Sequence, residues 1–72
     1  MKINVENIRT VKVGRPLIAK LDNRRDCNSA RNLVSYVNNT YPVKDHRYKV
    51  HVTTDNYIHI SLIPTDDEEN NV

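Results

Sequence analysis

The residues best suited to chemistry lie in the middle of the chain and are rich in side-chain amides. Polar residues follow one another there at spacings of four, three and four, with an arginine beside them: Asn28, Asn32, Ser35, Asn39 and Arg31. On a helix this spacing places the side chains on one face. In a DNA groove, amides pair with adenine edges, and guanidinium groups pair with guanine edges or phosphates. The strip therefore predicts either a DNA-contacting helix face or an ordinary solvated one.

Basic residues stand on both sides of this strip. Arg24 and Arg25 come just before the expected helix, and three more basic residues follow it. If the helix packs on the strands that come after it, we expect the two groups to flank one surface, where guanidinium forks suit phosphate oxygens. The predicted nucleic-acid-binding residues are Arg24, Arg25, Asn28, Arg31, Asn32, Ser35, Lys44, Arg47 and Lys49.

Two histidines and a tyrosine form a second candidate surface. His51 and His59 are expected opposite each other on neighbouring strands, near Tyr57. A stable zinc site needs a third and usually a fourth ligand, and nothing in the sequence places Cys27 or His46 beside the pair. We therefore expect no metal. The three residues predict a surface that stacks on unpaired bases or binds a partner protein.

Catalysis has no recognisable motif. Cys27 is the only cysteine, which excludes an internal disulfide, and Gly14 is the only glycine, which excludes a glycine-rich phosphate-binding loop. No ordered set of Asp, His and Ser points to a nucleophile. The sequence predicts a protein that is not an enzyme and that needs no cofactor.

Charge is divided unevenly along the chain. Residues 1 to 54 hold all 11 Lys and Arg against four acids, a net charge of +7, whereas residues 55 to 72 hold five acids and no Lys or Arg, a net charge of −5. A positive body attracts polyanions such as nucleic acid, although it also serves solubility. The residues after Pro64 have too little apolar surface to fold. This predicts one domain over residues 1–64 and a disordered acidic tail over 65–72.

A helix is predicted over residues 28–40. Its apolar stripe follows the spacing i, i+3, i+4 and i+7 and continues to a tyrosine before Pro42: Ala30, Leu33, Val34, Val37 and Tyr41. Asp26, Asn28 and Ser29 all offer side-chain oxygens for an N-cap. The polar stretch 22–29 is interpreted as a loop or the approach to the helix.

Residues 48–53 and 57–62 alternate with period two around Asp55-Asn56, which predicts a β-hairpin. A two-residue loop would mix the two faces. A three-residue loop over 54–56 instead pairs Val52 with Ile58 and Val50 with Ile60. Asn56 then takes the left-handed conformation that such loops require.

The N-terminal third is less regular. Ile3–Val5, Thr10–Val13 and Leu17–Leu21 are candidate strands, and Gly14-Arg15-Pro16 reads as a turn. At least one of these strands should pair with the hairpin, because an isolated hairpin is rarely stable. The expected fold is a single small α+β domain, with one helix on an antiparallel sheet that contains the C-terminal hairpin, in the order β(β)αββ. Its open sheet edge also suits a homodimer.

Four segments resemble a type of small phage-encoded β-α-β-β protein of unsettled function. They comprise a Val-Gly turn leading into an apolar strand, an Asn-Ser-Ala-Arg helix start, a basic strand and a closing strand: Val11–Ile18, Asn28–Tyr36, Tyr48–Val50 and Ile58–Ile60. That type carries aromatic residues after the turn and Trp-Arg in the last strand, where this chain has Leu17-Ile18 and His59-Ile60. The resemblance implies a phage origin and a βαβ-type core.

Two functions follow as hypotheses. The first is a small nucleic-acid-binding protein, a phage regulator or DNA-associated factor, with DNA favoured over RNA. The alternative is a protein-interaction module that inhibits a host enzyme or defence complex. The longest apolar run, Leu17-Ile18-Ala19, is far too short to span a bilayer, so we expect no membrane partner and a location in the host cytoplasm.

Overall fold

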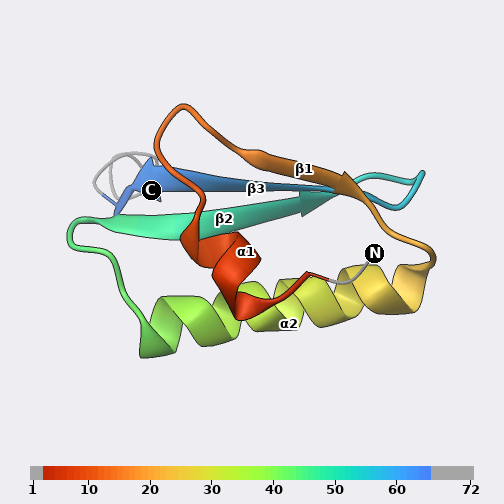
Figure 1. Ribbon diagram of the computed structural model, residues 1–72, viewed down its shortest axis with the longest axis horizontal. Helices are drawn as coiled ribbons and strands as arrows, with labels where there is room; N and C mark the ends of the chain where they lie inside the picture. Colours follow the sequence, from red (N-terminus) through yellow and green to blue (C-terminus); the bar gives the residue numbers. More distant parts are fainter. Residues whose placement is uncertain (1–2, 66–72) are drawn as a thin grey trace.

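The computed structural model describes residues 3–65 and shows two helices packed on one face of a three-stranded antiparallel sheet (Figure 1). The elements in chain order are α1 (Val5–Arg9), β1 (Leu17–Lys20), α2 (Arg24–Thr40), β2 (His46–Val52) and β3 (Tyr57–Pro64). The sheet order is β1-β3-β2, so the last strand is central. The α+β fold is as predicted. The element order within it is αβαββ, because the N-terminal segment is helical.

Helix α2 begins one turn earlier than predicted. Asn23, in extended conformation, accepts a hydrogen bond from the backbone N–H of Asp26 at 2.9 Å and caps the helix. The interpretation of 22–29 as a loop is therefore wrong from Arg24 onward. Cys27, which the sequence placed in that loop, lies in the first turn and is fully buried. The thiol behaves as an apolar group, so it extends the buried stripe by one turn.

The other end of the stripe is shorter than predicted. The buried residues of α2 are Cys27, Ala30, Val34 and Val37. Leu33 is only partly buried, and Tyr41 is 41% exposed at the C-cap. The Arg9 guanidinium lies 4.6 Å from the centre of the Tyr41 ring, within the range of a cation–π contact.

The hairpin has the predicted register. Val52 pairs with Ile58, Val50 with Ile60, and the two strands extend beyond the prediction to a His46–Pro64 pair. The Thr53 N–H donates to the Tyr57 carbonyl at 2.9 Å, which closes a three-residue loop. Asn56 has φ of 65°, the left-handed conformation expected of it.

The N-terminal third contains one of its three candidate strands. β1 pairs with β3 through Leu17–Ile60 and Ala19–Ile58, which confirms the expectation that one segment joins the hairpin. Ile3–Val5 is not a strand, because Asn4 and Asn7 exchange side-chain and backbone hydrogen bonds in a capping box that starts α1.

The candidate strand Thr10–Val13 is also absent, because only a single bridge between Lys12 and Arg15 forms there. Gly14 turns the chain between those two residues with φ of 80°. The left-handed conformation suits glycine, since it has no Cβ.

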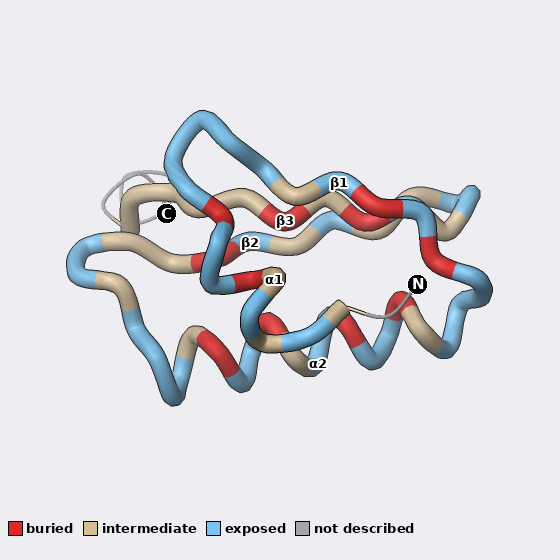
Figure 2. Tube along the Cα trace, in the orientation of Figure 1, coloured by how far each residue is buried: buried red, intermediate tan, exposed pale blue. Residues whose placement is uncertain are grey.

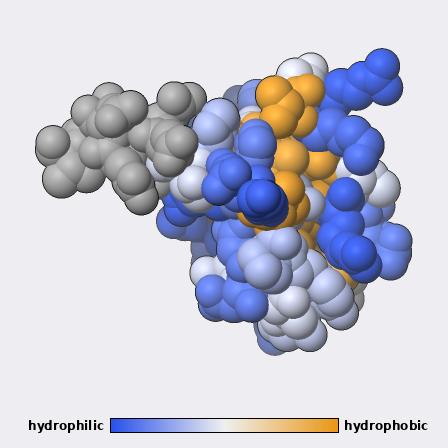
Figure 3. Space-filling model, turned by 90° about the vertical axis from the view of Figure 1, so that its left-hand side faces the viewer, coloured by the Kyte–Doolittle hydropathy of each residue, from blue (hydrophilic) through white to orange (hydrophobic). Residues whose placement is uncertain are grey.

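The core lies between the helices and the sheet (Figure 2). Its members come from every element and from two connecting segments: Ile8, Val11, Ala19, Leu21, Cys27, Ala30, Val34, Val37, Tyr48, Ile58 and Ile60. Seen from the end where α2 stops and β2 begins, a band of apolar side chains reaches the surface between hydrophilic ones (Figure 3). Burying these side chains from both layers is the main force that holds helices and sheet together.

The predicted domain end needs a small correction. The Thr65 N–H donates to the Asp45 carbonyl at 3.0 Å, so residue 65 is bonded to the domain. The rest of the predicted acidic tail, residues 66–72, lies outside the described residues.

Candidate nucleic-acid interface

Six of the nine predicted nucleic-acid-binding residues lie on α2 and are exposed. We call them, together with Asn39, the outer face of α2: Arg24, Arg25, Asn28, Arg31, Asn32, Ser35 and Asn39. Arg24 and Arg25 form part of the first turn of the helix rather than preceding it. The Arg24 Nη2 group lies 3.4 Å from the Thr54 carbonyl, which ties the start of α2 to the hairpin loop.

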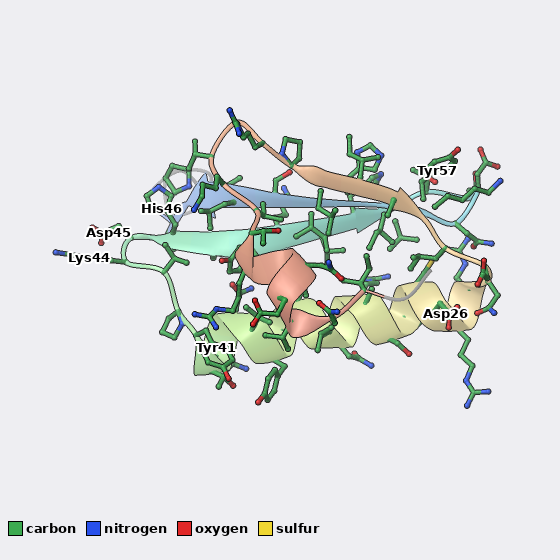
Figure 4. All side chains as sticks on the ribbon, in the orientation of Figure 1. Asp26, Tyr41, Lys44, Asp45, His46 and Tyr57 are labelled. Atoms are coloured by element: carbon green, nitrogen blue, oxygen red, sulfur yellow. The ribbon has the colours of Figure 1, made fainter. Side chains whose placement is uncertain are left out.

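The structure separates Lys44 from the two arginines that the sequence placed on the same surface. A 17-residue helix is about 25 Å long. Arg24 and Arg25 lie at its start, whereas Lys44 follows its end, and Figure 4 shows Lys44 and Asp26 at opposite ends of the molecule. Lys44 therefore does not join Arg24 and Arg25 in one cluster.

Four of the predicted residues do meet, in a recess between α2 and the free edge of β2. The recess has a volume of about 260 Å³. We call it the β2-edge recess, and it is lined by Arg31, Val34, Ser35, Asn38, Arg47, Tyr48, Lys49 and Val50. It thus brings Arg31 and Ser35 from the helix beside Arg47 and Lys49 from the strand.

Asn38 joins the two walls of this recess, and sequence reasoning missed it. Its Nδ2 group donates to the Tyr48 carbonyl at 2.9 Å, and its Oδ1 accepts from the Tyr48 N–H at 2.8 Å. The amide thus pairs with the outward backbone groups of an edge strand as a neighbouring strand would. The one available signal was its position, four residues after Val34 and next to Val37 at the border of the buried stripe.

The backbone of β2 also contributes to the recess. In an antiparallel ladder, successive residues turn their N–H and C=O groups alternately toward the paired strand and away from it. Tyr48 turns both groups toward Asn38, away from β3. Val50, two residues later, therefore turns the same groups toward the free edge, where it lines the recess.

The side of the sheet away from the helices carries the second candidate surface. The pairing register places nine side chains there, which we call the open sheet face: Ile18 and Lys20 from β1, Arg47, Lys49 and His51 from β2, and Tyr57, His59, Ser61 and Ile63 from β3. The predicted partner residues His51, Tyr57 and His59 are all among them. Figure 4 shows Tyr57 on the side of the sheet opposite α2.

The rings on this face have defined contacts. His51 pairs with His59 as predicted, with ring centres 6.3 Å apart and planes at 79°. The Lys20 ammonium lies 5.7 Å from the centre of the Tyr57 ring, within the range of a cation–π contact. Ile18, opposite His59, is 55% exposed.

None of the residues within 3–65 that line the β2-edge recess or belong to the open sheet face is acidic. Arg31, Arg47, Lys49 and Lys20 line the recess or the open sheet face. The acids of the described chain lie on α1, in the first turn of α2 and in loops: Glu6, Asp22, Asp26, Asp45 and Asp55. The charged side chains that residues 3–65 contribute to the recess and the open sheet face are therefore all basic, and basic side chains attract anionic ligands.

The remaining chemistry of residues 3–65 is sparse. Within that range no three His, Cys, Asp or Glu side chains gather as a metal site would require. The Cys27 Sγ is buried, 3.7 Å from the Asn56 carbonyl. None of the described helices combines the length and apolar character needed to cross a membrane.

Comparison of the chain with protein-family models, with curated proteins and with solved structures finds no match. The resemblance to small phage-encoded proteins therefore stays a hypothesis.

Proposed function

We propose that this protein binds nucleic acid and holds its phosphates at the β2-edge recess. The observation that carries the proposal is the meeting of Arg31, Arg47 and Lys49 around one recess, with the Ser35 hydroxyl beside them. Arg31 on the helix is 16 positions before Arg47 on the strand, so it is the packing of α2 on β2 that brings these residues together.

The chemistry of the recess suits phosphate. Guanidinium groups offer planar forks of donors to phosphate oxygens, and the lysine adds a point charge. The Ser35 hydroxyl and the outward N–H of Val50 are neutral donors of the kind that also position a nucleic-acid backbone. Phosphate contacts of this type give affinity without base selectivity, so sequence preference must come from another surface.

A protein-interaction module is the second candidate, and β1 favours it. Ile18 is exposed on this edge strand, and the ladder alternation turns the N–H and C=O groups of Ile18 and Lys20 away from β3. Such an edge can add a strand from a host protein or from a second copy. Inhibition of a host enzyme in the cytoplasm of a phage-infected cell would be one use of that edge.

Fluorescence anisotropy with labelled DNA and RNA oligonucleotides tests the first proposal. Binding should weaken steeply between about 50 and about 200 mM salt, because each neutralised phosphate releases counterions. The double change Arg31→Ala with Lys49→Ala should weaken binding and flatten the logarithmic salt slope by up to about two units.

A matched control removes the same charge elsewhere. Lys12→Ala with Arg15→Ala changes two exposed residues of the turn before β1, at the other edge of the sheet. This variant should retain most of the salt slope. Absence of binding to DNA and RNA at about 50 mM salt would refute the proposal, because electrostatic attraction is strongest there.

A further inference from the structure

We infer that the nucleic acid is single-stranded, and that its unpaired bases stack on the open sheet face while its phosphates cross the β2 edge to the recess. This inference rests on the proposed function and names the form of its ligand. The rings of the open sheet face lie among three cations, Lys20, Arg47 and Lys49.

The rings lie in two adjacent rows across the strands. Ile18, His59 and His51 form one row, because each is the cross-strand partner of the next. Tyr57 and Lys20 form the neighbouring row, about 7 Å further along the strands. That spacing lets one strand of nucleic acid meet rings of both rows without leaving the sheet surface.

The ring geometry leaves surface for a base. The planes of the His51 and His59 rings meet at 79°, edge to face. One of the two rings touches its neighbour only with its edge, so neither face of that ring is covered by the neighbour. The Tyr57 side chain is 39% exposed. Bases stack on such rings with little regard to sequence, because every base has an aromatic face.

Charge then connects this face with the recess. Arg47 and Lys49 belong to both surfaces, since the register places them on the open sheet face and they also line the recess. The sugar-phosphate backbone of a bound strand can therefore run from the rings over the β2 edge toward Arg31. Lys20 adds a cation at the other side of the rings.

A duplex fits these positions poorly. Its bases are stacked inside the helix and offer edges in the grooves rather than free faces, so rings on a flat sheet would meet only the sugar-phosphate backbone. A protein partner is also less favoured. The centres of stable protein interfaces are apolar and depleted in charge, whereas this face mixes Ile18 and Ile63 with three cations.

The test compares a labelled single strand of about 20 thymidines with a mixed-sequence single strand of equal length and its duplex, at about 100 mM salt. The full chain should bind both single strands at least about tenfold more tightly than the duplex. Tyr57→Ala, and separately His51→Ala with His59→Ala, should each weaken single-strand binding about tenfold. Their duplex binding should change by less than about twofold.

Two tyrosine variants serve as controls. Tyr36→Ala removes a ring that is 51% exposed on α2, away from the open sheet face, and it should leave single-strand affinity unchanged. Tyr57→Phe keeps the ring and should retain affinity within about twofold. The chain has four tyrosines and no tryptophan, so a stacking base should quench tyrosine emission in the unmodified protein more than in Tyr57→Phe.

The outcomes separate this inference from the proposal on which it rests. Equal affinity for single strand and duplex, or equal effects of Tyr57→Ala and Tyr36→Ala, would overturn the single-strand inference and leave nucleic-acid binding standing. No binding to any of the three oligonucleotides, combined with binding of a host protein that Tyr57→Ala abolishes, would overturn both. If Tyr57→Ala lowers the thermal midpoint, the histidine pair and Tyr57→Phe still decide the result.

Discussion

The outer face of α2 and the open sheet face lie on opposite sides of one core, and both carry basic side chains. On α2 the polar residues follow a convex helix, where side chains spread apart from one another. On the sheet, cross-strand neighbours lie about 5 Å apart at Cβ, so rings and cations share a flat surface. The comparison shows that the polar side chains spread apart on the helix, whereas rings and cations lie close together on the sheet.

The recess is where these two surfaces come closest. Arg31 and Ser35 reach it from the helix, and Arg47 and Lys49 reach it from the strand. The Asn38–Tyr48 pair holds the two walls together. Substitutions in the core, at the Asn38–Tyr48 pair and on each face should therefore have different effects on stability and on nucleic-acid affinity.

A charge in the core should abolish both surfaces. Val34 is 3% exposed and belongs to the apolar cluster between the helix and the sheet, so an aspartate there would bury a carboxylate among apolar side chains. Val34→Asp should lower the free energy of unfolding by at least about 4 kcal/mol, enough to unfold a domain of this size. Circular dichroism melting measures this, with exposed Asn32→Ala as the control. A native melting curve for Val34→Asp would contradict the assignment of the core.

Loss of the Asn38–Tyr48 pair should open the recess and spare the open sheet face. Asn38→Ala removes both bonds to Tyr48 and should cost about 2 kcal/mol of stability. The amide hydrogen of Tyr48 should exchange faster with solvent. The affinity for nucleic acid should fall, because the phosphate contacts at the recess are weakened, while Tyr57→Ala should still reduce single-strand binding in this background. Asn39→Ala, one residue along and exposed, is the control. Equal melting midpoints for the two variants would show that the Asn38 pair does not hold β2 to α2.

Changing the amides on the outer face of α2 separates a solvated strip from a groove-reading one. Alanine has a higher helix propensity than asparagine, so Asn28→Ala with Asn32→Ala should raise the free energy of unfolding by about 1 kcal/mol. Nucleic-acid affinity should stay within about twofold. If this variant instead loses affinity for one duplex sequence more than for another, then the outer face of α2 reads bases and is the main contact surface.

The smallest effect is expected from the acidic end of the chain. Deleting residues 66–72 removes four acids and raises the net charge from +2 to +6. Affinity for nucleic acid should rise a few-fold, most at low salt, where screening is weakest. Anisotropy titrations at two salt concentrations measure the change, and a variant with Asn and Gln in place of the four acids controls for length. An unchanged affinity at low salt would show that this charge does not reach the ligand.

Several features of the fold followed directly from residues close together in the chain. The hairpin register and the facing pair of His51 and His59 were predictable because a period-two pattern and a loop with Asn56 specify each other locally. The start of α2 was not, because the polar residues around Cys27 conceal that its thiol is the first buried group of the stripe. The short alternation at Ile3–Val5 predicted a strand, but Asn4 and Asn7 form a capping box that starts a helix there instead.

The sequence by itself determined the α+β class, the hairpin, the main helix and the uneven distribution of charge, because periodicity and turn chemistry act over a few residues. Tertiary structure alone decided that β1 joins the far edge of β3, that Asn38 closes part of the β2 edge, and that Arg31 meets Lys49 while Lys44 stays apart from Arg24. Those outcomes depend on how two apolar layers pack over distances of ten to forty residues along the chain. Burial is non-directional, so side-chain shape and hydrogen bonding at the contact select the arrangement.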